Sequence, residues 1–212
     1  MSVAQRSSRG KEGSDVEAGL RAARQFGLVG YRQALDCGLS HSSISRRVAT
    51  GAWVRVLPRV YRLASTPESW RQRALAACLW AGQAAALSHQ AAAYLWGFEG
   101  FRECTIEVMT PKSLRVSAPW LVIHRVRRLT SFDTTRRDGI PVTTPSRTLL
   151  DLGAVCHEGA VDIAIDSALR EGLVSMHRLE RQLETSGTKR PPRNFRPPSP
   201  PSCPWPLLQS YG

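Results

Sequence analysis

The chain has 212 residues and carries 29 lysines and arginines against 17 aspartates and glutamates, so its formal net charge is +12. Its most apolar run, residues 74–87, is interrupted by Gly82 and Gln83 and is too short to span a bilayer, and the N-terminal residues contain no apolar secretory segment. The odd number of cysteines, without a C-x-x-C pair, argues against a disulfide framework or a cysteine-bound zinc, so we expect a cytoplasmic protein with no membrane partner.

The first part of the chain predicts a disordered segment followed by two helices. Residues 1–14 are small and polar, which is typical of disorder. In residues 15–26, apolar side chains such as Val16 and Leu20 recur at helical spacing and form one side of a first helix. A second helix follows and ends at Gly38, which supplies a sharp turn.

A third helix is predicted over residues 41–50, with the Ser40 hydroxyl as its N-terminal cap and Gly51 at its end. The helical period places Ile44 and Val48 on one side and polar side chains on the other. The polar side consists of Ser42, Ser43, Arg46 and Thr50, with Arg47 at its flank. Such a surface can enter a major groove, where an arginine contacts guanine and hydroxyls suit base edges or phosphates.

Residues 53–63 predict a two-stranded hairpin, because two β-branched and aromatic runs flank a turn that contains Pro58. Residues 37–64 contain no carboxylate and five arginines, which are Arg46, Arg47, Arg55, Arg59 and Arg62. We therefore interpret residues 15–64 as a winged helix-turn-helix that binds double-stranded DNA. In this hypothesis Arg46 and the hydroxyls of the third helix contact bases, and the other four arginines contact phosphates. The alternative is a winged helix that docks another protein without binding DNA.

Residues 65–186 predict a small mixed α+β domain, so the fold class is α+β throughout. A helix begins with Thr66 as its cap and Pro67 in its first turn, and a shorter helix begins after Ser88. Strand-like runs and further helix signals then alternate with polar loops. The strands are expected at 104–110, 120–126 and 140–143, and the helices start at 145, 158 and 175. Residues 187–212 are rich in proline and predict a disordered tail, a composition that a frameshifted or truncated reading frame would also produce.

The second domain contains no recognisable catalytic apparatus. A metal-dependent nuclease needs a carboxylate followed by Glu-x-Lys, and the spacing of Glu103, Glu107 and Lys112 does not fit. His89 and His124 are better explained as a capping-turn histidine and a packed one. We therefore expect no catalytic residue, metal, cofactor or enzymatic activity. A second basic cluster at residues 125–137 is either a solvated strand edge or a surface for DNA, RNA or an acidic protein face.

Three stretches of this sequence resemble a known family. They are GLVGYRQALDCGLSHSSISRRVATGAWVRVLPRVYRL, LSHQAAAYLWGF and RRDGIPVTTPSRTLLDL. Together they resemble the AbiEi-type antitoxins and transcriptional regulators of bacterial type IV toxin-antitoxin systems, over residues 15–185. The resemblance implies a winged helix that binds operator DNA and represses its own operon, and a second domain that counteracts a nucleotidyltransferase-like toxin.

The sequence departs from this family in two places. Related sequences commonly carry glycine where Arg59 stands, in the turn of the hairpin. Many longer relatives continue into a Vsr-like endonuclease domain, which this sequence lacks. A truncated remnant of such a fusion is therefore the other alternative.

Overall fold

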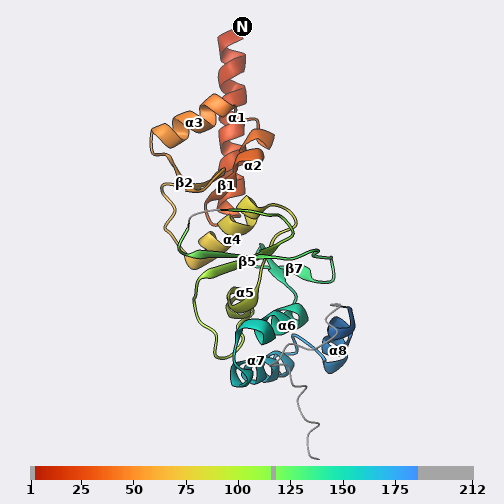
Figure 1. The fold of residues 1–212 in the computed structure, drawn as a ribbon. Coiled ribbons are helices and arrows are strands. Elements are labelled where there is room, and N and C mark those ends of the chain that lie inside the picture. The colour runs from red at the N-terminus through yellow and green to blue at the C-terminus, as the bar shows by residue number, and fades with distance from the viewer. Residues whose placement is uncertain (1–2, 116–117, 186–212) are drawn as a thin grey trace, which may run out of the picture.

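The structure is a computed structural model that describes residues 3–115 and 118–185, so the predicted proline-rich tail at 187–212 lies outside the described residues. Within the described residues the chain is α+β, as predicted, with two separate β-sheets and eight helices. Figure 1 shows an elongated arrangement, with the N-terminal helices and small sheet at one end, the larger sheet in the middle and a layer of helices at the other end.

The N-terminal unit has the element order of a winged helix, which is helix, strand, helix, helix, strand, strand. Its elements are α1 (Val3–Ala23), β1 (Leu28–Gly30), α2 (Tyr31–Asp36), α3 (His41–Ala49), β2 (Trp53–Leu57) and β3 (Val60–Leu63). β3 pairs antiparallel with both other strands, so the sheet order is β1-β3-β2. The predicted hairpin is thus present, and β1, which the sequence analysis did not predict, completes the sheet.

α1 differs from its prediction in length and in orientation. It begins at Val3, so residues 3–14 are helical where we expected disorder. Extending a helix is inexpensive once part of it is anchored by packing. The packed side is formed by Ala18 and Ala22, whereas Val16 and Leu20, predicted to face the core, are 62% and 57% exposed. Small alanines allow the helix backbone to approach the sheet more closely than the larger side chains would.

The second unit is built around a five-stranded mixed sheet. Its strands are β4 (Ala86–Leu87), β5 (Ile106–Thr110), β6 (Leu121–Arg125), β7 (Thr134–Arg137) and β8 (Ile140–Thr143). They lie in the order β6-β5-β4-β8-β7, with β5–β6 and β4–β8 parallel and the other pairs antiparallel. β5, β6 and β8 match the predicted strand runs, and β4 and β7 are additional strands.

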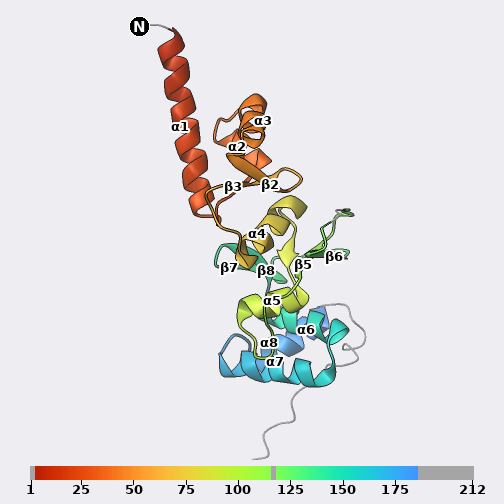
Figure 2. The ribbon, with the colours of Figure 1, turned by 90° about the vertical axis from the view of Figure 1, so that its left-hand side faces the viewer.

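Five helices surround this sheet. They are α4 (Trp70–Ala81), α5 (His89–Trp96), α6 (Pro145–Val155), α7 (Glu158–Arg170) and α8 (Met176–Thr185). α4 lies on the side that faces the N-terminal unit, and α5 and α6 lie on the opposite side, with α7 and α8 beyond them (Figures 1 and 2). None of the described helices combines the length and the apolar character needed to cross a lipid bilayer.

α4 joins the two units into one packed body. Leu28, Leu57 and Val60 of the small sheet belong to the same hydrophobic cluster as Leu75 of α4 and the buried residues of the larger sheet. The predicted boundary at residue 64 therefore separates two sheets that share a core. α4 also begins later than predicted, because the Ser69 hydroxyl, and not that of Thr66, accepts the N-terminal hydrogen bond, from the Gln72 amide at 3.2 Å.

A sharp turn leads from α1 into β1 and predicts a measurable effect of substitution. Gly27 has φ +78°, and a Cβ there would lie 2.3 Å from Thr66 Oγ1 and 2.6 Å from Thr66 Cβ. We expect Gly27→Ala to lower the free energy of unfolding by about 1–2 kcal/mol, because it adds both backbone strain and a steric clash. Urea denaturation of the full chain measures this loss.

Gly19→Ala is the matched control for this prediction. Gly19 lies within α1 and a Cβ there meets no atom within 4 Å. Alanine is the better helix former, so Gly19→Ala should leave stability unchanged or raise it by up to about 1 kcal/mol. Equal losses from the two substitutions would show that the turn geometry is not the cause.

Candidate nucleic-acid interface

α3 presents its polar side to solvent, as its sequence period predicts. The Ser40 hydroxyl accepts from the Ser43 backbone amide at 3.2 Å and caps the helix. Ile44 is only 1% exposed, and Val48 packs against the same hydrophobic cluster. Arg46 is exposed on the opposite side. The apolar residues therefore anchor the helix and leave the arginine available for a partner.

The predicted base-contacting hydroxyls differ in their exposure. Ser42 is exposed, with its Oγ 3.0 Å from Ser40 Oγ, whereas Ser43 is half-buried. Thr50 is exposed at the C-cap and donates to the Arg47 carbonyl at 3.3 Å. The sequence analysis overlooked Ser45, which is exposed one turn from Ser42 and which helical spacing alone would have found.

Arg55 and Arg59 lie exposed on the hairpin beside α3. Arg59 occupies the hairpin turn with φ +62°, a left-handed conformation that glycine adopts more easily. The Arg59 guanidinium lies 5.8 Å from the centroid of the Tyr31 ring, and this contact holds the side chain near α2.

Arg47 and Arg62 are less available than the sequence suggested. Arg47 forms an ion pair with Asp15 of α1, donates to the Ser43 carbonyl at 2.8 Å, and is 16% exposed. Arg62 pairs with Glu68 at 3.4 Å and is 12% exposed. The absence of carboxylates from residues 37–64 therefore does not leave these two arginines unpaired. Both carboxylates lie outside residues 37–64, and the fold brings them near the two arginines.

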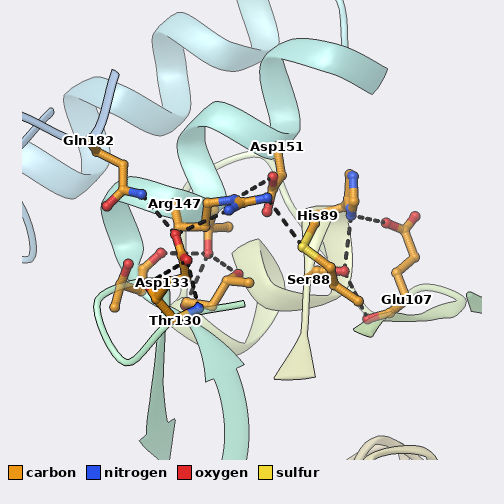
Figure 3. A network of polar contacts seen from close by, with 12 residues as sticks. Ser88, His89, Glu107, Thr130, Asp133, Arg147, Asp151 and Gln182 are labelled. Atoms are coloured by element: carbon orange, nitrogen blue, oxygen red, sulfur yellow. Dashed lines mark hydrogen bonds and ion pairs between the residues drawn. The ribbon is translucent and has the colours of Figure 1, made fainter. Parts of the chain in front are cut away.

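A buried polar network centred on Arg147 holds together the far side of the larger sheet (Figure 3). Arg147 of α6 donates to Asp133 at 3.1 Å and to Asp151 at 2.9 Å. Asp133 also accepts from the Thr130 amide and hydroxyl, at 2.9 and 2.7 Å, and from Gln182 of α8 at 3.0 Å. The network thus links α6, α8 and the loop before β7.

The pKa values of the two carboxyl groups of this network are shifted in opposite directions. Burial raises the pKa of Asp133, but hydrogen bonds from Thr130 and the Arg147 guanidinium outweigh it and hold that pKa below its usual value. Burial raises the pKa of Asp151 to about 6, against the lowering effect of Arg147. Arg147 keeps its charge, because the two carboxylates raise its pKa despite burial. Sequence analysis assigned no role to this arginine.

His89 and His124 are packed together. This agrees with the prediction of a packed histidine but not with that of a capping turn. Their rings stack with centroids 3.8 Å apart. The side chain of Ser88 does not cap α5, because its hydroxyl donates to the Glu107 carbonyl at 3.5 Å and lies 3.0 Å from His89 Nδ1. Thr144 likewise makes no side-chain cap to α6 and donates to the Phe132 carbonyl at 3.4 Å.

The second basic cluster divides between solvent and an aromatic contact. Arg125, Arg127 and Arg128 are exposed at and after the end of β6. Arg137 instead places its guanidinium 4.8 Å from the centroid of the Trp96 ring.

Comparison with known families accounts for both units. The family described as "AbiEi antitoxin C-terminal domain" matches residues 83–194, which is more than half of the chain. The chain belongs to the AbiEi antitoxin family. A second family, "Transcriptional regulator, AbiEi antitoxin", matches residues 20–64 of this AbiEi chain. The resemblance noted in the sequence is confirmed, and both matches leave out residues 65–82, which contain the bridging helix α4.

A search of curated proteins found no match to this AbiEi chain. Among solved structures, it is similar to the crystal structure of the RV2827C protein from Mycobacterium tuberculosis. The two share 16% sequence identity with a TM-score of 0.48, over 81% of this chain and 71% of the other.

Proposed function

We propose that this AbiEi-family chain is a cytoplasmic repressor that binds double-stranded operator DNA of its own operon, and that it is the antitoxin of a type IV toxin-antitoxin system. Family membership supports a role as regulator or antitoxin. The observation that carries DNA binding is the orientation of α3, which buries Ile44 and exposes Arg46 beside the arginines of the hairpin. In this proposal the chain acts by binding and not by catalysis.

The arginines divide into those that read bases and those that hold the backbone. Arg46 projects from the exposed side of α3, where it reaches a base edge if the helix enters a major groove. Arg55 and Arg59 lie on the hairpin, where they contact phosphates of either strand. Arg47 and Arg62 contribute less to phosphate binding than the sequence suggests, because Asp15 and Glu68 already pair with them.

DNA binding is tested with the region upstream of the chain's own gene, by fluorescence anisotropy at several salt concentrations. Arg46→Ala should weaken binding to this region by roughly 5- to 150-fold and reduce its preference over unrelated DNA. Arg59→Gly should weaken binding to all sequences alike and lower the salt slope by about 1, without straining the turn. Arg102→Ala is the control, because Arg102 is exposed and lies outside the N-terminal unit.

Equal, sequence-independent losses from Arg46→Ala and Arg59→Gly would contradict the assignment of α3 as the base-reading element. If the unmodified chain showed no salt-dependent binding to the upstream region, the docking alternative would replace DNA binding.

The antitoxin role is tested separately by co-expressing the full chain with a neighbouring nucleotidyltransferase-like gene and measuring growth. If the second unit counteracts the toxin, Arg46→Ala should rescue growth as well as the unmodified chain does, although it no longer represses the operon. Failure of the unmodified chain to restore growth would refute the antitoxin role and leave DNA binding intact.

A further inference from the structure

Three side chains from separate elements converge beneath α5. They are His89 at the start of that helix, Glu107 of β5 and His124 of β6. Glu107 Oε2 lies 3.7 Å from His89 Nδ1 and 3.5 Å from His124 Nε2, and the three atoms are all within 4.8 Å of one another. Figure 3 shows His89 and Glu107 turned toward each other beside the Arg147 network.

These contacts are not ordinary hydrogen bonds. Nitrogen and oxygen partners normally lie about 2.7–3.2 Å apart, and both separations here exceed that range. Glu107 Oε2 and His124 Nε2 are nonetheless buried, and neither has a hydrogen-bond partner among the described residues. Buried polar atoms without a partner are rare and unfavourable, so these two atoms, with His89 Nδ1 close to Glu107 Oε2, point to a common partner.

We propose that His89, Glu107 and His124 bind one divalent transition-metal ion, with Zn²⁺ as the ion that fits best. Two imidazoles and one carboxylate form a ligand set that zinc accepts, and three protein ligands leave one position for solvent. Zinc bonds of about 2.0–2.2 Å place tetrahedral ligand atoms roughly 3.3–3.6 Å apart. The distances of 3.7 and 3.5 Å from Glu107 Oε2 to the two histidine nitrogens are within a few tenths of an ångström of this range. A set with a single carboxylate does not suit Mg²⁺ or Ca²⁺, which prefer several oxygen ligands.

The surroundings keep the ligands ready for a cation. His89 Nδ1 lies 3.7 Å from Glu107 Oε2 and 3.0 Å from Ser88 Oγ, and metal binding replaces the second of these contacts. The positive charge of Arg147, in the adjacent network, is already neutralised by its ion pairs with Asp133 and Asp151. Metal binding does not orphan the Ser88 hydroxyl, because that group donates to the Glu107 carbonyl.

The backbone also directs the ligands toward one point. β5 and β6 are parallel, with Glu107 opposite Val122 and Met109 opposite His124, so the two ligands lie diagonally on the same face of the sheet. His89, opposite this face, has φ +50°, a left-handed backbone conformation that is unfavourable for a residue other than glycine.

The bound ion has a structural role in this arrangement. It joins α5 to β5 and to the edge strand β6. The His89, Glu107 and His124 side chains are only 7%, 15% and 28% exposed, so a substrate has little access. The site therefore stabilises the second unit and is independent of the proposed DNA contacts.

The test uses the full chain, stripped of metal with a chelator and then titrated with zinc against a chromophoric competitor. We expect one Zn²⁺ per chain, and a melting temperature that rises by roughly 5–10 °C at a zinc concentration about 100 times the Kd. Co²⁺ in place of zinc should give the visible absorption bands of a four- or five-coordinate site. Glu107→Gln and His124→Asn should each weaken zinc binding by at least about 10-fold.

His177→Asn is the matched control, because His177 is exposed on α8 and lies outside the cluster. It should bind zinc like the unmodified chain. Without metal, Glu107→Gln should remain folded, since it removes an unpaired buried carboxylate charge; if it does not fold, His124→Asn at the more exposed position decides. Absence of stoichiometric binding, or binding that Glu107→Gln and His124→Asn leave unchanged, would overturn the proposal and indicate a bridging water or zinc held by cysteines.

Discussion

Replacing Arg147 with alanine should lower the free energy of unfolding by about 3–5 kcal/mol, because it leaves Asp133 and Asp151 buried without their shared cation. These residues are 8% and 7% exposed, so bulk solvent screens their charges only weakly. The loss should appear as a lower midpoint in urea denaturation with an unchanged slope, if the rest of the chain keeps its packing.

The control for this prediction is an ion pair of similar length at the surface. Arg170 lies 2.7 Å from Glu99, but the two side chains are 59% and 63% exposed. Arg170→Ala should therefore change stability by only about 0–1 kcal/mol, since solvent screens the pair. A second comparison combines Arg147→Met with Asp133→Asn and Asp151→Asn. If unpaired charge is the cause, the triple variant should recover much of the loss; a triple variant as unstable as Arg147→Ala would attribute the effect to packing instead.

The N-terminal unit could largely be predicted from sequence because its signals are local. Ser40 and Gly51 delimit α3, and the spacing of Ile44 and Val48 identifies its buried side. Each of these features depends on residues within one or two turns of helix. The pairing of Arg47 with Asp15 could not be predicted in this way, because it depends on where α1 packs. The choice of Ala18 and Ala22 as the packed side of α1 likewise depends on how closely two elements approach.

The larger sheet was predicted only where its strands carry a run of apolar or β-branched side chains. β5 and β8 carry apolar side chains that mark them in the sequence. β7 has the sequence TTRR at an edge of the sheet, and its pattern resembles a polar loop. β4 has only two residues, too few to establish a period. Capping was misassigned at Thr66 because Ser65, Thr66 and Ser69 all precede α4, and local sequence does not determine which hydroxyl accepts the bond. Ser88 is the N-cap residue of α5, but its hydroxyl donates to the Glu107 carbonyl of another strand.

The buried polar clusters could not be found from sequence at all. Asp133, Arg147 and Gln182 lie on separate elements, and nothing in their spacing indicates contact. His89 and His124 are each unremarkable within their own segment. Only the parallel register of β5 and β6, and the position of α5 across them, bring these groups together. The same limitation applies to any site that is assembled from tertiary contacts and not from a continuous motif.

The pH dependence of stability should distinguish the two carboxylates that Arg147 holds. The pKa of Asp151 rises from 3.8 to about 6 on folding, so the folded state binds more protons than the unfolded state between these values. The contribution of Asp151 to stability is therefore greatest below 3.8, falls as the pH rises, and is constant above 6. The whole change amounts to about 3 kcal/mol, of which about 2 kcal/mol lies between pH 4.5 and 7.5.

Asp151→Asn should remove this dependence. Urea denaturation measures the free energy of unfolding of the variant minus that of the unmodified chain. This difference should be about 2 kcal/mol larger at pH 7.5 than at pH 4.5, and a constant offset introduced by the amide does not affect it. Asp133→Asn should show the opposite sign. The pKa of Asp133 is lowered on folding, so its ionised form contributes stability that is lost as the pH falls. Relative to the unmodified chain, Asp133→Asn should therefore be less stable at pH 7.5 than in acid. Differences of the same sign in the two variants would mean that burial and hydrogen bonding do not shift the two pKa values in opposite directions.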